Sequence, residues 1–115
     1  MTKSEMKTRT KKYALRVIKA VQALPNDRVA NVLGSQLLRS GTSVGANYRA
    51  ACRAKSTADF VNKLKIGDES LFWMELLVES GITPQQRLGE LMKEGDELVS
   101  IVVASLKTTR SATGS

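Results

Sequence analysis

Apolar side chains recur every three or four positions over residues 13–24, which is the spacing of one face of an α-helix. The positions between them carry Lys and Arg, so this helix is amphipathic with a basic outer surface. Leu24 precedes Pro25, and proline disfavours helical geometry in the residue before it, so the helix is predicted to end there. Residues 1–9 show no apolar period and are predicted to form a flexible basic arm.

A second apolar stripe runs over residues 30–51 and contains Gly34, Gly41 and Gly45. The segment SGTSVGAN within it is also typical of a loop, and local propensity alone favours a loop. We predict a helix because the apolar period continues through the segment. Each interior glycine costs about 1 kcal/mol relative to Ala, so this helix is expected to recover that energy by letting another backbone come close.

Two further stripes predict a third and a fourth helix. The third follows a polar turn at Lys55 and Ser56, and Gly81 stands just past its end, where glycine commonly terminates helices. The fourth is predicted to begin with Thr83 as its cap and Pro84 at its first helical position.

Length and composition agree with one helical domain. The chain has 115 residues, and its apolar content of 42% is enough for one core. Four helices joined by short turns pack most simply as an antiparallel up-down-up-down bundle, which we predict for residues 10–107. Residues 108–115 are small and polar and are predicted to be a disordered tail.

Residue types that usually carry catalysis or bind metal are scarce. The chain has no histidine, and its single cysteine, Cys52, excludes an internal disulfide and leaves no plausible zinc site. The carboxylate pairs Asp68 with Glu69 and Glu75 with Glu79 are typical of solvated helix faces, and GTSVG lacks the GK[ST] of a phosphate loop. We therefore expect a protein that is not an enzyme and needs no cofactor or metal.

Hydropathy along the chain bears on cellular location. The longest apolar runs fall far short of the roughly 20 residues that cross a bilayer. The N-terminus is charged, with no apolar signal core behind it. With a single thiol in addition, a reducing cytoplasm fits best, and no membrane contact is expected.

Charge is concentrated in the first half of the chain. Residues 1–55 hold 12 Lys and Arg against 2 Asp and Glu, whereas residues 56–115 hold 6 against 9. Two explanations stay open: a surface for phosphate backbones, or a basic half that pairs with the acidic half inside the bundle. Aromatic residues are few, so any nucleic-acid binding should be driven by the backbone and sensitive to salt. The candidate contacts are Lys7, Arg9, Lys11, Lys12, Arg16, Lys19, Arg49, Arg53 and Lys55.

Arg39 interrupts an otherwise uncharged run over residues 29–48. An unpaired buried guanidinium is very costly, so a carboxylate partner on the third helix is predicted, with Glu69 and Glu75 as the candidates. Contact of Arg39 with a phosphate is the alternative.

The string LLRSGTSVGANYRAACRAKSTADFVNKLKI, followed by ESLFWMELLVESGI, closely resembles the bacterial four-helix bundle proteins also called 23S rRNA intervening-sequence proteins. The similarity spans residues 13–107, and RSGTSVGAN and WMELL are its specific parts. The resemblance implies a four-helix bundle without catalytic residues, and the related accessory proteins of diversity-generating retroelements imply a barrel-shaped homopentamer. The family name comes from reading frames inside ribosomal RNA insertions, which implies contact with RNA.

Several residues are assigned structural roles from this resemblance and from the glycine pattern. They are Arg39, Gly41, Gly45, Asn47, Glu69, Trp73 and Glu75. Many relatives carry about four more residues between KLKI and ESLFWMELL than this chain does. Four residues are close to one helical turn, so the apolar stripes stay nearly in phase, but Glu69 shifts relative to Arg39.

The sequence supports two alternative functions. The first is a non-enzymatic, homo-oligomeric bundle whose basic first half binds RNA or another nucleic acid. The alternative is an oligomeric scaffold that recruits a protein partner and uses its charge only to pair subunits.

Overall fold

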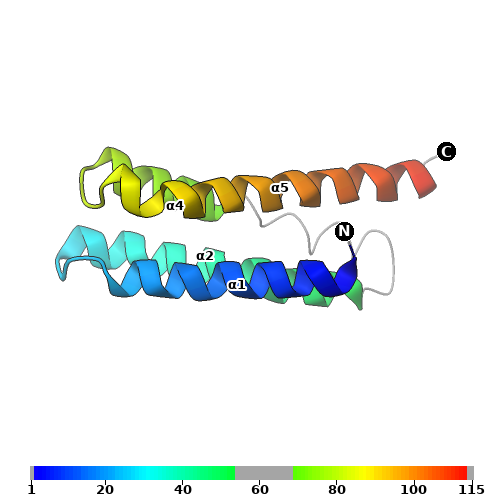
Figure 1. Cartoon of the computed structure of the whole chain (residues 1–115), viewed down its shortest axis with the longest axis horizontal. Coiled ribbons are helices and arrows are strands. Elements are labelled where there is room, and N and C mark those ends of the chain that lie inside the picture. The colour runs from blue at the N-terminus through cyan, green and yellow to red at the C-terminus, as the bar shows by residue number, and fades with distance from the viewer. Residues whose placement is uncertain (1, 54–68, 114–115) are drawn as a thin grey trace.

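The computed structural model describes residues 2–53 and 69–113. These residues form four helices and no strand, which confirms the predicted all-helical class. The helices are α1 (Lys3–Gln22), α2 (Arg28–Cys52), α4 (Glu69–Glu79) and α5 (Gln85–Thr113), as Figure 1 shows. The predicted start of the third helix at residues 55–57 lies outside the described residues.

The four helices surround one core. Helix α1 packs against α2 and α5, and α4 packs against the same two neighbours. The α1–α2 turn and the α4–α5 turn lie at the same end of the molecule, whereas both chain termini lie toward the other end (Figure 1). Residues far apart in sequence, on α1 and α5, are therefore side by side along the length of the molecule.

Short polar residues mark several of the helix ends. The Asp27 side chain accepts a hydrogen bond from the backbone N–H of Ala30 at 2.9 Å and so caps α2. Gly81 adopts a φ of +81° just after α4, a conformation that L residues rarely take, which confirms its role as a terminator. Thr83 is the predicted cap of α5, but within the described part of the chain no hydrogen bond from the α5 backbone to its hydroxyl is found, and the Arg87 N–H donates to the Pro84 carbonyl at 3.0 Å. The Thr83 backbone N–H donates to the Leu77 carbonyl at 3.1 Å.

The structure corrects both predicted ends of the helical region. Helix α1 begins at Lys3, so most of the predicted flexible arm of residues 1–9 is helical. Thr2 caps this helix by accepting from the Glu5 N–H at 3.1 Å, and Met6 is buried. At the other end α5 continues to Thr113, past the predicted boundary at residue 107. Once a helix has nucleated, each added residue needs little further stabilisation, so polar residues can extend it.

The core contains apolar side chains from all four helices and one buried polar pair. The Tyr13 hydroxyl on α1 lies 2.9 Å from Ser70 Oγ on α4, so both polar groups are satisfied inside the core. Gly95 on α5 makes room for this pair, because a Cβ there would lie 2.7 Å from the Tyr13 hydroxyl. The buried apolar residues include Val17, Leu37, Met74, Leu77, Leu88, Leu91 and Leu98.

Helix α2 lies unusually close to α1 at its glycines. A Cβ on Gly41 would lie 2.7 Å from Val17 Cγ1, and one on Gly45 would lie 3.2 Å from Thr10 Oγ1. Real Cβ atoms essentially never approach a neighbour within 3.0 Å. The helical interpretation of SGTSVGAN is thus confirmed, and α1 is the neighbour for which these glycines make room.

We predict that Gly41→Ala destabilises the protein although alanine is the better helix former. The new methyl group meets the Val17 side chain, and overpacking of this kind costs about 1–3 kcal/mol, against a gain of about 1 kcal/mol in helix propensity. Gly89→Ala on α5 is the matched control, since its Cβ finds an ordinary 3.6 Å contact. The control should be neutral or stabilising. Urea unfolding followed by circular dichroism measures both, and equal stabilisation by the two substitutions would contradict the packing argument.

We also predict that both tyrosines ionise only in strongly alkaline solution. Burial raises the pKa of Tyr13 above its ordinary value, and burial together with the neighbouring Cys52 thiol raises the pKa of Tyr48 to about 12. Because the ordinary value is about 10 in an unfolded chain, ionisation favours unfolding, and stability should fall as the pH rises above that value. Absorbance at the tyrosinate band against pH measures this. A midpoint at or below the ordinary pKa would show the prediction to be wrong.

Candidate nucleic-acid interface

The cations predicted to contact nucleic acid gather on α1 and at the end of α2. Lys55 lies outside the described residues. Arg49 lies in the last turn of α2, and Arg53 follows that helix directly. Both are exposed. The remaining six residues, of which all but Arg9 are exposed, lie along α1: Lys7, Arg9, Lys11, Lys12, Arg16 and Lys19.

Small side chains open a groove between α1 and α2, which we call the α1–α2 groove. It has a volume of about 260 Å³. Lys7, Lys11 and Arg49 line it together with the short residues Thr10, Ala14, Thr42, Gly45 and Ala46. None of these eight described residues is acidic. The structure therefore brings three of the predicted cations together around one concave surface.

A second hollow, the α1–α5 cavity, lies near the end of the molecule that holds the two turns. Its volume is about 350 Å³. Arg16 and Lys19 reach it from α1, and Arg87 reaches it from the first turn of α5. The rest of its lining is Thr83 and the apolar residues Ala20, Ala23, Leu24 and Leu91. The sequence does not identify Arg87 as a candidate contact, because it lies in the acidic half of the chain. No neighbouring residue in the sequence indicates that it lies near the two cations of α1.

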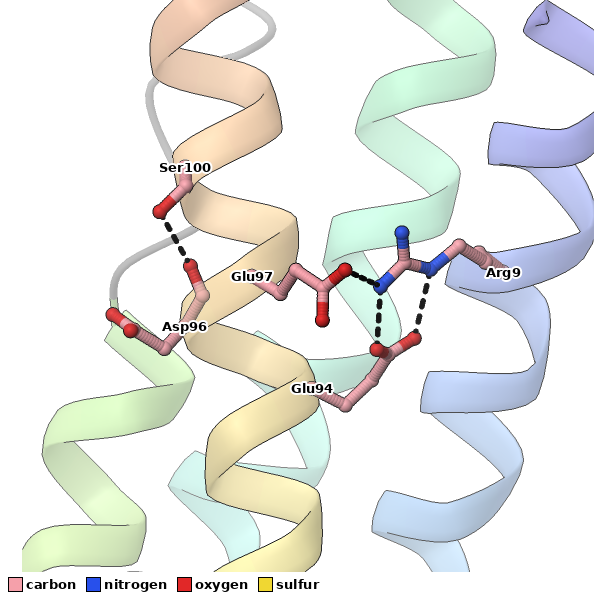
Figure 2. A network of polar contacts seen from close by, with 5 residues as sticks. All are labelled: Arg9, Glu94, Asp96, Glu97 and Ser100. Carbon is pink, nitrogen blue, oxygen red and sulfur yellow. Dashed lines mark hydrogen bonds and ion pairs between the residues drawn. The ribbon is translucent and has the colours of Figure 1, made fainter. Parts of the chain in front are cut away.

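Arg9 forms an ion pair within the bundle. Its Nε and Nη2 donate to the two carboxylate oxygens of Glu94 at 3.1 and 2.6 Å, and Nη2 also lies 3.1 Å from Glu97 Oε1 (Figure 2). This geometry is bidentate, the stronger kind of Arg–carboxylate contact. The hydrogen bond with Glu94 raises the pKa of Arg9 above its ordinary value. For Arg9, pairing between the basic and acidic halves is thus the observed role.

The other cations are not paired in this way. Among residues 2–53 and 69–101, Arg9 is the one cation found within 4.0 Å of a carboxylate. The cations of the α1–α2 groove and of the α1–α5 cavity therefore form no ion pair with a described carboxylate.

The predicted ion pair of Arg39 is not formed with either candidate on α4. Arg39 lies exposed on α2, and within the described part of the chain it makes no ion pair with Glu69 or Glu75, which are also exposed. An exposed guanidinium is solvated, so it needs no internal partner. Glu69 instead accepts a hydrogen bond from Trp73 Nε1 at 3.3 Å. Asn47, the remaining candidate structural residue, is half-buried on α2.

The described residues contain no group of three or more His, Cys, Asp or Glu side chains arranged to hold a metal ion. Within the same residues, no helix combines the length and apolar content needed to span a bilayer. The absence of a catalytic role stays a prediction.

Several large apolar side chains remain on the surface of the chain. Val29 and Val32 on α2 are each 56% exposed, and Phe72 on α4 is 51% exposed. Phe72 also makes an edge-to-face contact with Trp73, with ring centroids 5.1 Å apart.

Comparison with known proteins identifies the family. The family model of the 23S rRNA-intervening sequence protein matches residues 2–104. Among solved structures, the chain is similar to the crystal structure of a protein with unknown function from the S23 ribosomal protein family of Bacteroides thetaiotaomicron. The two share 32% sequence identity with a TM-score of 0.81, over 89% of this chain and 98% of the other. A search of curated proteins returns no match. The chain belongs to the 23S rRNA-intervening sequence protein family.

Proposed function

We propose that this protein binds RNA, or another nucleic acid, through the cations of α1 and of the end of α2, without transforming it. The α1–α2 groove is the observation that carries this proposal. Lys7, Lys11 and Arg49 line one concave surface, and none of its lining residues is acidic.

The shape of the groove suits a phosphate backbone. Five of its eight described lining residues have short side chains, so a strand can come close to the helices while the longer Lys and Arg side chains reach its phosphates. Each neutralised phosphate releases condensed counterions, which supplies affinity without reading sequence. No aromatic side chain is among the groove's described lining residues, so recognition should tolerate many sequences.

The family supports the same ligand class. Its description contains 23S rRNA, and the solved relative is assigned to the S23 ribosomal protein family. The first description names ribosomal RNA and the second names a ribosomal protein family, and both are consistent with an RNA ligand. We propose a cytoplasmic location on the same grounds.

We further propose that the chain is an antiparallel up-down-up-down bundle that assembles into a homo-oligomer, with the pentamer implied by the family resemblance as the expected state. The exposed apolar residues Val29, Val32 and Phe72 support an interface, because exposed apolar side chains gain free energy when a partner covers them. An oligomer repeats the α1–α2 groove, and several grooves on one strand raise the overall affinity.

A scaffold that recruits a protein partner is the second candidate. The exposed Phe72 beside Trp73 favours it, since aromatic residues are enriched at protein interfaces. A partner that stays bound to purified protein after nuclease treatment would support the scaffold over nucleic-acid binding.

The test of the proposed function removes two groove cations and compares the loss with that of two cations elsewhere. Lys11→Gln with Arg49→Gln should weaken binding of a labelled single-stranded RNA roughly tenfold at low salt. The same pair should lower the slope of log affinity against log salt by about 1.4, because two phosphate contacts are lost. Fluorescence anisotropy at several salt concentrations measures both quantities.

Arg28→Gln with Lys93→Gln is the matched control, since both residues are exposed, lie outside the groove and carry the same total charge. This control should lose little affinity. No binding by the unaltered protein at low salt, or an equal loss in the two double variants, would refute the proposed function.

A further inference from the structure

The α1–α5 cavity gathers three cations that the α1–α2 groove does not use: Arg16, Lys19 and Arg87. We propose that this cavity binds the terminal phosphate group of a nucleotide. The nucleotide is either free or the end of an RNA strand, and the second form rests on the proposed function.

The positive charge of the cavity favours binding of a compact anion. Three positive charges from two helices surround one volume of about 350 Å³, and no acidic residue is among its described lining residues. Like charges held this close repel each other, and an anion between them relieves the repulsion. A terminal phosphate monoester carries a charge of about −1.5 to −2 at neutral pH, with three acceptor oxygens. An internal phosphodiester carries a single negative charge, so the terminal group matches three cations better.

A polar side chain lies at the same place. Thr83 lines the cavity and is only 7% exposed. Its hydroxyl can donate a hydrogen bond to an oxygen of a phosphate group in the cavity. The start of α5 at Gln85 adds the positive end of a helix dipole beside it.

The remaining wall of the cavity is apolar. Ala20, Ala23, Leu24 and Leu91 line it next to the cations. A bare phosphate ion would leave this surface in contact with water, whereas the sugar and base of a nucleotide would cover it. Pockets for small ligands have volumes of about 300–1,000 Å³, and this cavity falls within that range.

The cavity and the groove lie on two sides of the same helix. Lys7 and Lys11 of α1 face the groove with α2, and Arg16 and Lys19 face the cavity with α5. From Lys11 to Lys19 the helix rises about 12 Å. A strand that leaves the groove must also pass around the helix, whose diameter with side chains is about 10–12 Å, so a few nucleotides can place its end near the cavity.

The experiment compares probes that differ only by one terminal phosphate. Calorimetry measures adenosine 5′-monophosphate against adenosine. Anisotropy measures one labelled oligonucleotide with a 5′-phosphate against the same oligonucleotide with a 5′-hydroxyl. In both pairs the phosphate should raise the affinity of the full-length protein about tenfold, the gain of one charge-assisted hydrogen-bonded contact.

Variants of the cavity residues test whether the gain in affinity from the terminal phosphate arises in the cavity. Arg87→Gln, and separately Lys19→Gln, should abolish the preference for the terminal phosphate. Thr83→Val should reduce it without any change of charge, and Thr83→Ser should retain it. Lys93→Gln is the control on α5, because it removes one exposed charge outside the cavity and should leave the preference intact.

The outcomes separate this inference from the proposed function. If the oligonucleotides bind but the terminal phosphate adds nothing, the inference fails and the proposed function stands. If adenosine 5′-monophosphate binds in a manner that depends on Arg87 while no oligonucleotide binds, the proposed function fails and the cavity remains a nucleotide site. Equal effects of Arg87→Gln and Lys93→Gln would also overturn the inference.

Discussion

The close approach of α2 to α1 is the constraint on which the rest of the molecule depends. Gly41 and Gly45 leave room that Val17 and Thr10 occupy: a Cβ at Gly41 would clash with Val17, and one at Gly45 would require Thr10 to shift by a few tenths of an ångström. The glycines weaken α2 as an isolated helix, and packing against α1 offsets this weakness. Gly45 and Thr10 also line the α1–α2 groove, so the contact that joins the two helices forms part of the wall of this groove.

The basic half of the chain divides its cations between structure and surface. Arg9 forms a bidentate pair with Glu94 and so joins α1 to α5 (Figure 2). The exposed cations on α1 have no such partner among the described residues. Long-range pairing therefore explains Arg9, whereas the other described cations of α1 and α2 lie exposed on the surface.

Helix α1 lines both the α1–α2 groove and the α1–α5 cavity because a helix presents different faces to its two neighbours. Lys11 faces the groove with α2, and Arg16 faces the cavity with α5, to which Arg87 adds a third cation. The proposed functions of the two sites follow from this division: an elongated strand in the groove, and the end of a strand in the cavity. The Arg9–Glu94 ion pair is compatible with both proposed sites, because neither residue lines the groove or the cavity.

The sequence by itself determined the helices, their apolar faces, the stops at Pro25 and Gly81 and the family, because periodicity, caps and turn residues act over a few positions. It missed the early start of α1, where Met6 is the one apolar residue of the first turns. Only the tertiary structure decided that Arg39 faces solvent and that Arg87 joins the cations of α1. These outcomes depend on how each helix is rotated and placed against its neighbours, which is fixed by packing across the whole core.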